Sequence, residues 1–227
     1  MNVIETNNLF KIYRQGEIEV KALNDVSINF KQGEFTAIVG PSGSGKTTFL
    51  NAIGGLDTPN SGKVIIHNTD ITELKPNQLI DFRLRNIGFV FQAYNLIPVL
   101  TAKENVEFIM LMQGTSPAER KLRSDELLKA VGLGDKLDRR PGQLSGGQQQ
   151  RVAVARALAS KPQYVLADEP TANLDSTSTA NLLDIMYRMN QEEKMTFIFS
   201  THDQRVIDRA KRIITLEDGK ILSDITQ

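Results

Sequence analysis

The stretch Gly40–Thr48, "GPSGSGKTT", decides the fold of this chain. It follows Glu34–Gly40, "EFTAIVG", an almost continuous apolar run of the kind found in strands buried on both faces of a sheet. A helical run, "TTFLNAIGGL", comes next, so the stretch fits the G-x-x-x-x-G-K-[ST] pattern in its required strand–loop–helix context. The alternative, a flexible Gly/Ser loop with a chance lysine, leaves that context unexplained. We therefore expect a nucleoside triphosphate site on a parallel α/β sheet.

The residue types of this loop predict how it holds phosphate. Glycines let the backbone wrap the phosphate groups, Lys46 reaches the β- and γ-phosphates, and the Thr47 hydroxyl is a suitable ligand for Mg²⁺. We expect nucleotide-binding residues along the whole loop, namely Gly40, Pro41, Ser42, Gly43, Ser44, Gly45, Lys46, Thr47 and Thr48.

Composition narrows the class of protein. Lys plus Arg and Asp plus Glu number 27 each, so no global charge marks nucleic acid as the partner. The chain has no cysteine, which excludes disulfides, structural Cys–zinc sites and thiol catalysis. No secretory signal is visible, and the apolar stretch Phe108–Met112, "FIMLM", is far shorter than the roughly 18–20 residues of a spanning helix. We expect a soluble, cytoplasmic protein whose membrane role comes through a partner.

Two later apolar runs resemble the first, and helical segments separate them. They are Tyr164–Glu169, "YVLADE", and Thr196–Thr201, "TFIFST", so a parallel sheet with crossover helices is expected. Between about Pro98 and Leu158 the pattern becomes helical, with a capping box at Ser116–Glu119, "SPAE". We interpret this part as a helical lobe inserted into the α/β core. Arg212–Leu222, "RIITLEDGKIL", predicts two short strands around an Asp-Gly turn.

Polar side chains end several of these apolar strands. Asp168 suits a metal ligand and Glu169 suits a base that polarises an attacking water; the alternative is that both cap the next helix. Gln92 ends "IGFVFQ" and His202 ends "FIFSTH". The carboxyl ends of parallel strands meet at one edge of the sheet, where α/β proteins bind ligands. We interpret all four as candidates for one site, although a strand-terminal Gln also occurs simply where a chain leaves the core.

Two further features of the sequence suggest a role in ligand binding without a charged group of their own that would perform it. Tyr13, in "LFKIYRQG", has two even alternatives, stacking on a base or packing in the core. Gln143–Leu158, "QLSGGQQQRVAVARAL", is a Gly-rich turn that leads directly into a helix. Such a turn offers backbone N–H groups and a positive dipole end to an anion, yet it carries none of the usual phosphate-binding lysines.

Together these motifs resemble the ATP-binding-cassette (ABC) ATPases over nearly the whole chain. "GPSGSGKT" looks like the Walker A loop, "YVLADE" like the Walker B strand, and Leu144–Gln148, "LSGGQ", like the family signature. Gln92 matches the Q-loop, Asn173–Ser176, "NLDS", the D-loop, and His202 the switch histidine. Tyr13 falls where the adenine-stacking aromatic is expected. No catalytic position departs from the pattern.

The resemblance implies a fold. It is a P-loop NTPase (RecA-like) α/β core with a parallel sheet, an N-terminal antiparallel β subdomain and an inserted α-helical subdomain. Residues 1–227 would form a single ABC ATPase domain, with residues 1–92 and 159–227 in the core and β subdomain. Residues from about 93 to 158 would form the helical signature subdomain.

The resemblance also implies a homodimer on ATP binding, packed head to tail, with each ATP between the P-loop of one copy and the signature of the other. Glu169 would orient the attacking water, His202 would contact the γ-phosphate, and Gln92 would sense it. Asp175 would cross the interface. The implied cofactors are ATP and Mg²⁺, the metal being held by Thr47, Gln92 and Asp168, and the residues offered to the other copy's γ-phosphate are Ser145, Gly146, Gly147 and Gln148.

The stretch Tyr94–Leu100, "YNLIPVL", contains apolar residues that we expect to be exposed. There are two interpretations: these residues pack in the core of the helical lobe, or they form a groove for a coupling helix of a permease. Its context resembles bacterial lipoprotein-release, macrolide-export and cell-division cassettes. These drive a separate permease from the cytoplasmic face of the inner membrane. A soluble ABC ATPase acting on nucleic acid is the alternative, but it usually needs coiled-coil arms or zinc insertions. We see neither heptads nor cysteines between Lys46 and Asp168, and expect no nucleic-acid partner.

Overall fold

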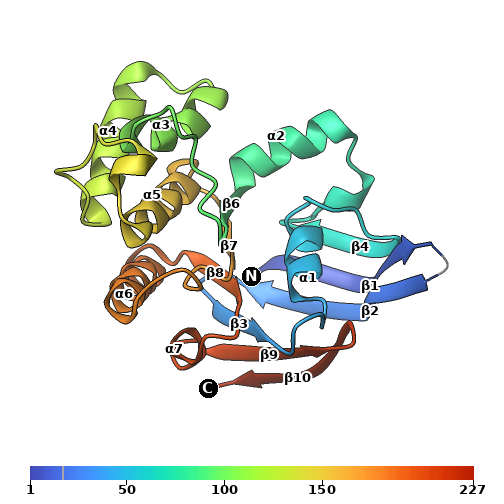
Figure 1. Cartoon of the computed structure of the whole chain (residues 1–227). Helices are drawn as coiled ribbons and strands as arrows, with labels where there is room; N and C mark the ends of the chain where they lie inside the picture. Colours follow the sequence, from blue (N-terminus) through green and yellow to red (C-terminus); the bar gives the residue numbers. More distant parts are fainter. Residues whose placement is uncertain (17) are drawn as a thin grey trace.

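A six-stranded sheet forms the centre of the molecule, in the strand order β10-β9-β3-β8-β7-β6 (Figure 1). The structure, a computed structural model, describes residues 1–16 and 18–227. Strands β9, β3, β8, β7 and β6 are parallel, and β10 pairs antiparallel with β9. The strands are β3 (Phe35–Val39), β6 (Ile87–Val90), β7 (Tyr164–Asp168), β8 (Thr196–Ser200), β9 (Arg212–Glu217) and β10 (Lys220–Thr226).

The three predicted buried strands are confirmed as β3, β7 and β8. All five residues of β8 are buried, as a strand covered on both faces requires. The Asp-Gly turn between β9 and β10 is also present. Asp218 and Gly219 have φ values of 47° and 72°, the left-handed pair that a tight hairpin turn needs. Local sequence therefore determines these elements.

A second, antiparallel sheet lies beside the first, in the order β2-β1-β4-β5. The predicted N-terminal antiparallel sheet is thus confirmed. Phe49, Leu50 and Ile53 of the helix α1 (Lys46–Ile53) share one buried cluster with residues of both sheets, so α1 packs between them (Figure 1). The strands of this sheet are β1 (Asn2–Gln15), β2 (Ile18–Lys31), β4 (Ser61–Ile66) and β5 (Thr69–Asp70).

Three helices form a separate group between β6 and β7 in the sequence (Figure 1). They are α3 (Ala102–Met112), α4 (Pro117–Ala130) and α5 (Gly146–Ala159). The helix predicted from the capping box at Ser116 is confirmed as α4. We propose that this group, about residues 93–158, is the helical subdomain, set into the core that residues 1–92 and 159–227 form.

Of the remaining helices, α2 (Pro76–Asn86), which the sequence analysis did not predict, connects the two sheets, whereas α6 (Ser176–Glu193) and α7 (Gln204–Ile207) each connect two strands of the six-stranded sheet. There are also 3₁₀ turns at Ile71–Glu73 and Pro141–Gln143. Within residues 1–16 and 18–227, no helix combines the length and the apolar character that crossing a membrane takes.

Candidate active site

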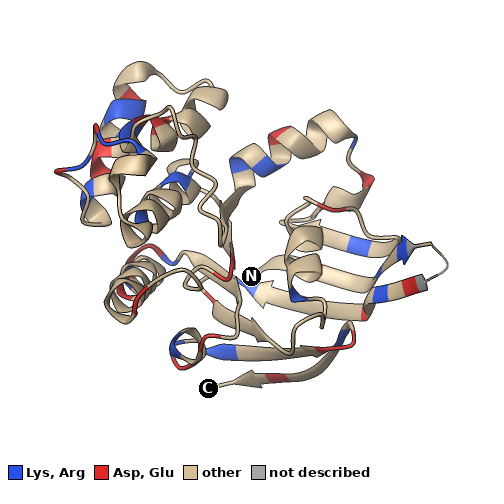
Figure 2. Cartoon of the chain, viewed as in Figure 1, with Lys and Arg blue, Asp and Glu red and all other residues tan. Residues whose placement is uncertain are grey.

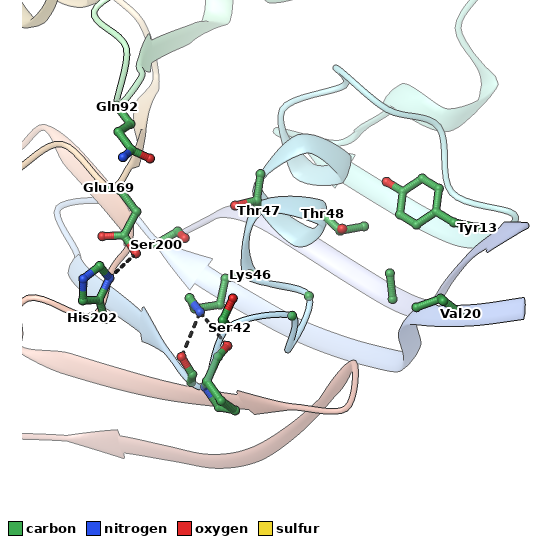
Figure 3. A pocket seen from close by; sticks show the side chains of 15 residues that line it. Tyr13, Val20, Ser42, Lys46, Thr47, Thr48, Gln92, Glu169, Ser200 and His202 are labelled. Carbon is green, nitrogen blue, oxygen red and sulfur yellow. Dashed lines mark hydrogen bonds and ion pairs between the residues drawn. The ribbon is translucent and has the colours of Figure 1, made fainter. Parts of the chain in front are cut away.

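A cavity of about 740 Å³ opens at the carboxyl ends of the central strands, where parallel sheets bind ligands (Figure 3). It joins segments that lie far apart in the sequence: β1, the loop after β3, and the residues that follow β6, β7 and β8. The predicted site residues that line it are Tyr13, Gly40, Pro41, Ser42, Gly43, Gly45, Lys46, Thr47, Thr48, Gln92, Glu169 and His202.

The loop between β3 and α1 has glycine at the three positions where the backbone takes a positive φ, Gly40, Gly43 and Gly45. Gly40 and Gly45 have φ values of 146° and 101°, which other residues rarely adopt. A Cβ on Gly45 would also lie 2.2 Å from the carbonyl oxygen of Ala22. Because Gly45 caps α1, the helix begins at Lys46 and its N-terminal end faces the cavity. Unpaired N–H groups and the helix dipole favour an anion there.

The Lys46 ammonium is held by its own loop. Nζ donates hydrogen bonds to the carbonyl oxygens of Gly40, at 2.8 Å, and Pro41, at 2.9 Å (Figure 3). Neither acceptor carries a full charge, so the positive charge remains for a phosphate. An anionic oxygen makes a stronger hydrogen bond with an ammonium than a carbonyl does.

Thr47, Gln92 and Asp168 offer oxygen atoms suitable for a divalent cation, although Asp168 is not among the residues that line the cavity. The hydroxyl of Thr47 donates to Oδ1 of Asp168 across 3.1 Å, and the amide of Gln92 lines the same cavity. The described part of the chain contains no cluster of three or more His, Cys, Asp or Glu side chains placed to hold a metal. One carboxylate, one hydroxyl and phosphate oxygens are nevertheless the ligand types that Mg²⁺ takes in nucleotide sites. The residues present therefore fit Mg²⁺.

Glu169 is fixed in an uncommon backbone conformation. Its φ is 44°, and its N–H donates to the carbonyl of Ser200 over 2.9 Å. Such conformations in non-glycine residues concentrate at functional sites. The carboxylate Oε1 lies 2.8 Å from Nδ1 of His202, and Thr201 donates to Oε2 at 3.3 Å (Figure 3). Glu169 and His202 thus meet at the cavity, with the histidine 76% exposed.

Tyr13 projects from β1 beside the loop. The residue is 41% exposed, so the core-packing alternative for this ring is wrong. Its hydroxyl donates to Oδ2 of Asp57 at 2.6 Å, and Lys11 pairs with the same carboxylate at 2.5 Å. Partial burial and the hydrogen bond to Asp57 raise the pKa of Tyr13. The ring is therefore held at its tip, and stacking on a base stays a prediction.

Three cavity residues were missed by the sequence analysis. Val20, Ala22 and Ser200 also line the cavity. Val20 is 51% exposed and pairs directly with Tyr13 in the β1–β2 ladder. Alternation along "EVKA" was the signal for a strand here. The pairing register could not be predicted from the sequence, because the β1–β2 ladder is irregular at several points. Each irregularity changes which residue of β2 lies opposite a given residue of β1.

The structure places the signature residues outside this cavity. Ser145 caps α5: its Oγ accepts from the N–H of Gln148 at 3.3 Å, and Gln148 Oε1 accepts from the N–H of Ser145 at 3.0 Å. The space at Gly146 is filled by Tyr94, whose hydroxyl would lie 2.8 Å from a Cβ there. A side chain on Gly147 would likewise meet Ser178. Within one chain these residues do not reach the loop at Lys46.

Asp175 has a capping role in the described chain. Its Oδ1 accepts from the N–H of Ser178 at 2.9 Å at the start of α6, and this hydrogen bond is the main cause of its lowered pKa. The Ser44 hydroxyl, predicted to bind phosphate, is buried under the loop and does not line the cavity. Asp175 and Ser44 thus have structural roles within the chain, one as a helix cap and the other as a buried loop residue.

A second cavity, of about 450 Å³ and mostly apolar, lies on the other side of β6, between α2, α3 and α5. We call it the β6 groove. Of the predicted strip Tyr94–Leu100, only Asn95 and Ile97 line it. The strip is divided between the two alternatives: Leu96 is half-buried and packs against the helical core, whereas Val99 is 72% exposed. The lining residues are Leu56, Ile80, Arg83, Leu84, Ile87, Gly88, Phe89, Phe91, Asn95, Ile97, Phe108, Ile109, Arg156, Ala157 and Ser160.

Known proteins share this combination of loop, strand ends and helical group. The model of the family described as "ABC transporter" matches residues 23–172, more than half of the chain. The chain belongs to the ABC transporter family. It is an ABC ATPase domain, which confirms both the fold and the family expected from the motifs.

Relatives of this ABC ATPase fall into two kinds. An uncharacterized ABC transporter ATP-binding protein of Thermotoga maritima is 48% identical over 96% of the chain and 93% of its own length. A macrolide export ATP-binding/permease protein, MacB, of Brucella melitensis is 46% identical over 99% of the chain. The chain spans only 35% of that MacB protein. A solved structure, the dimeric post-hydrolysis state of the ATP-binding cassette MJ0796 with ADP and Pi, superposes with a TM-score of 0.91 at 44% identity, covering 98% of each chain.

Proposed function

We propose that this ABC ATPase hydrolyses ATP to drive a separate membrane permease of the mechanotransmission type, as in lipoprotein release, macrolide or peptide export, or cell division. The observation that carries the proposal is the joining of Lys46, Glu169, His202 and Gln92 at one cavity, with the apolar β6 groove beside it. The relatives named for ABC transport and macrolide export support the same class of function.

Nucleotide binding would use the loop and the ring beside it. The N–H groups at the start of α1 and the Lys46 ammonium would hold the phosphates, with Lys46 exchanging the carbonyls of Gly40 and Pro41 for phosphate oxygens. Tyr13 would stack on the adenine. Thr47, Asp168 and Gln92 would hold Mg²⁺, which, when bound, neutralises charge on the phosphates.

Hydrolysis would use Glu169 and His202. Glu169 Oε1 would accept a proton from water while the water oxygen bonds to the γ-phosphorus and the bond to the ADP oxygen breaks. Nδ1 of His202 lies 2.8 Å from that carboxylate oxygen. His202 would turn its ring nitrogen to the γ-phosphate, and Gln92 would contact the phosphate or the attacking water.

The second half of the site would come from another copy of the chain. Ser145, Gly146, Gly147 and Gln148 carry signature chemistry yet lie outside their own cavity, and the similar cassette MJ0796 is dimeric. In a head-to-tail homodimer they would cover the γ-phosphate held by Lys46 of the other copy. Asp175 would lie near the two-fold interface.

The permease would dock on the β6 groove and the neighbouring exposed Val99. The protein would then be cytoplasmic, peripheral on the cytoplasmic face of the inner (plasma) membrane. The alternative, a soluble ABC ATPase acting on nucleic acid, has less support, because positive and negative side chains balance at 27 each and the relatives are named for transport.

The test is Glu169→Gln with ATP and Mg²⁺. Glutamine keeps the size but cannot take a proton, so turnover falls at least ~100-fold, and ATP-loaded protein accumulates as a dimer in light scattering. The same change combined with Lys46→Ala is the control and stays monomeric, because nucleotide no longer binds. Turnover near that of the unmodified chain, or a monomer at saturating ATP, contradicts the proposal.

A further inference from the structure

We infer that the β6 groove binds a short apolar helix carrying a carboxylate, and that this carboxylate pairs with Arg156 and Arg83. The inference rests on the proposed function, because it names the chemistry of the segment that docks there.

The groove offers open apolar surface from several elements. Leu56 is 42% exposed, Ile80 of α2 is 54% exposed and Phe108 of α3 is 37% exposed, and all three line the groove. Covering such side chains contributes roughly 25 cal/mol per Å² of apolar surface. The flanking helices α2 and α3 have 11 residues each, so each is about 16 Å long. A helix of about three turns matches that length.

Two arginines provide all the ionisable groups that line the groove within residues 1–16 and 18–227. Arg156 donates to the carbonyl oxygens of Tyr94, at 2.8 Å, and Asn95, and Arg83 donates to that of Gly55 at 2.7 Å. A guanidinium has five N–H donors. These contacts leave N–H groups of both side chains for a ligand.

Three acidic residues are next in sequence to residues that line the groove, and all three are engaged elsewhere. Glu107 precedes Phe108 but accepts a hydrogen bond from Ser124 at 3.0 Å. Asp57 follows Leu56 in sequence but pairs with Lys11 at 2.5 Å. Asp81 follows Ile80 but pairs with Arg85 at 3.0 Å on α2. Figure 2 shows basic segments on both α2 and α5, the helices on either side of β6. The groove therefore presents two positive charges in an apolar setting without a carboxylate of its own.

This charge decides what can cover the groove. Partial burial already lowers the pKa of Arg156. A neutral apolar helix would remove the guanidinium from water without supplying an opposite charge, which is unfavourable, whereas a carboxylate would form a charge-assisted, bidentate pair. A basic helix would add repulsion. The groove thus selects for acid-bearing helices and against the others.

The probe for the test is a phage-displayed library of three-turn Leu/Ala helices, with Glu, Gln and Lys in equal proportion at each variable position. The library is selected on the full chain and depleted on Ile80→Asp, which spoils the groove at an exposed site. We expect enriched clones to carry Glu, and the synthetic Glu peptide to bind at least tenfold more tightly than its Gln form. That preference should weaken at high salt.

Variants assign the preference to the arginines. Arg83→Gln and Arg156→Gln should each reduce the Glu-over-Gln ratio at least threefold. Lys129→Gln, an exposed change on α4 outside the groove, should leave the ratio unchanged. Arg156→Gln also removes the donor to the carbonyl oxygens of Tyr94 and Asn95, so this variant can fail to fold. In that case Arg83→Gln alone tests the assignment to the arginines. A ratio near one on the unmodified chain overturns the inference while leaving the docking surface in place. If no clone distinguishes the chain from Ile80→Asp, docking on the groove itself fails, whereas ATP turnover by the free chain tests the ATPase separately.

Discussion

Tyr13 is a single side chain held in position by contacts within its own chain. Its hydroxyl is held by Asp57, which Lys11 also contacts, and the Lys11 ammonium lies 5.1 Å from the ring centroid. The hydrogen bond thus fixes the tip of the ring beside the phosphate loop. Rigid aromatic surface at the mouth of a nucleotide cavity is what stacking on a base requires.

Two substitutions separate the ring of Tyr13 from its hydroxyl. Tyr13→Ala removes the stacking surface and should weaken ATP binding about tenfold, since stacking on a base is worth about 1–3 kcal/mol. Tyr13→Phe keeps the ring and should change the affinity less than threefold. Titration with a fluorescent ATP analogue measures both, and GTP serves as control because stacking tolerates any base. Equal losses for the two variants would assign the role to the hydroxyl.

Among the elements, the short helix α7 shows how the end of β8 is anchored. Asp203 caps α7 and accepts from Thr171 at 2.8 Å and from Arg205 at 2.6 Å. These contacts, with that from Arg205 first, lower the pKa of Asp203 from 3.8 to about 2. Because the cap residue directly follows His202, it also helps to fix the backbone from which the His202 side chain projects.

The pH dependence of this cap has a definite sign. A folded-state pKa below the ordinary value means that Asp203 stabilises the fold above pH 3.8 and that this contribution is lost as pH falls toward about 2. Asp203→Asn should cost ~1 kcal/mol at neutral pH, after allowing for solvent screening. Urea unfolding at several pH values should show the gap to the unmodified chain narrowing with acid. Asp208→Asn, at the exposed end of α7, is the control, and a gap that is constant with pH would rule out the carboxylate as its source.

Elements also show what could be predicted from sequence. The buried strands β3, β7 and β8, the loop after β3 and the capping box of α4 depend on neighbouring residues, so local pattern was enough. Helix α2 was missed, because all its residues are half-buried or exposed and it shows no clear apolar stripe. Leu96 lies in an irregular segment, where no periodicity tells which side chain turns inward. The β6 groove was located only roughly, since its lining comes from segments spread between Leu56 and Ser160.

At the scale of the whole molecule, the loop at Lys46 and the predicted signature residues do not share a cavity within one chain. The loop at Lys46 lines the cavity, while Ser145 and its helix α5 lie outside it. The proposed dimer follows from this separation. A change at the signature should therefore affect assembly and turnover without affecting the nucleotide held by the same chain.

Ser145→Arg tests that expectation. The added side chain blocks the surface that would cover the other copy's γ-phosphate, so ATP-dependent dimerisation is lost and turnover falls at least ~100-fold. ATP affinity of the single chain stays within about threefold of the unmodified protein, because Ser145 does not line the cavity. Ser116→Arg, at the equivalent capping position of α4, controls for loss of a helix cap. Unchanged turnover by Ser145→Arg would exclude a role of the signature in a second copy's site.

The two cavities meet at a single peptide bond. Phe91 lines the β6 groove and Gln92 lines the nucleotide cavity, as neighbouring residues at a strand end point to opposite sides. Linkage makes any influence across this bond reciprocal: the factor by which ATP changes the affinity of the groove for its helix equals the factor by which the helix changes the affinity for ATP. In the proposed assembly, binding of the permease helix would therefore change the nucleotide occupancy by the same factor by which nucleotide changes the binding of the helix.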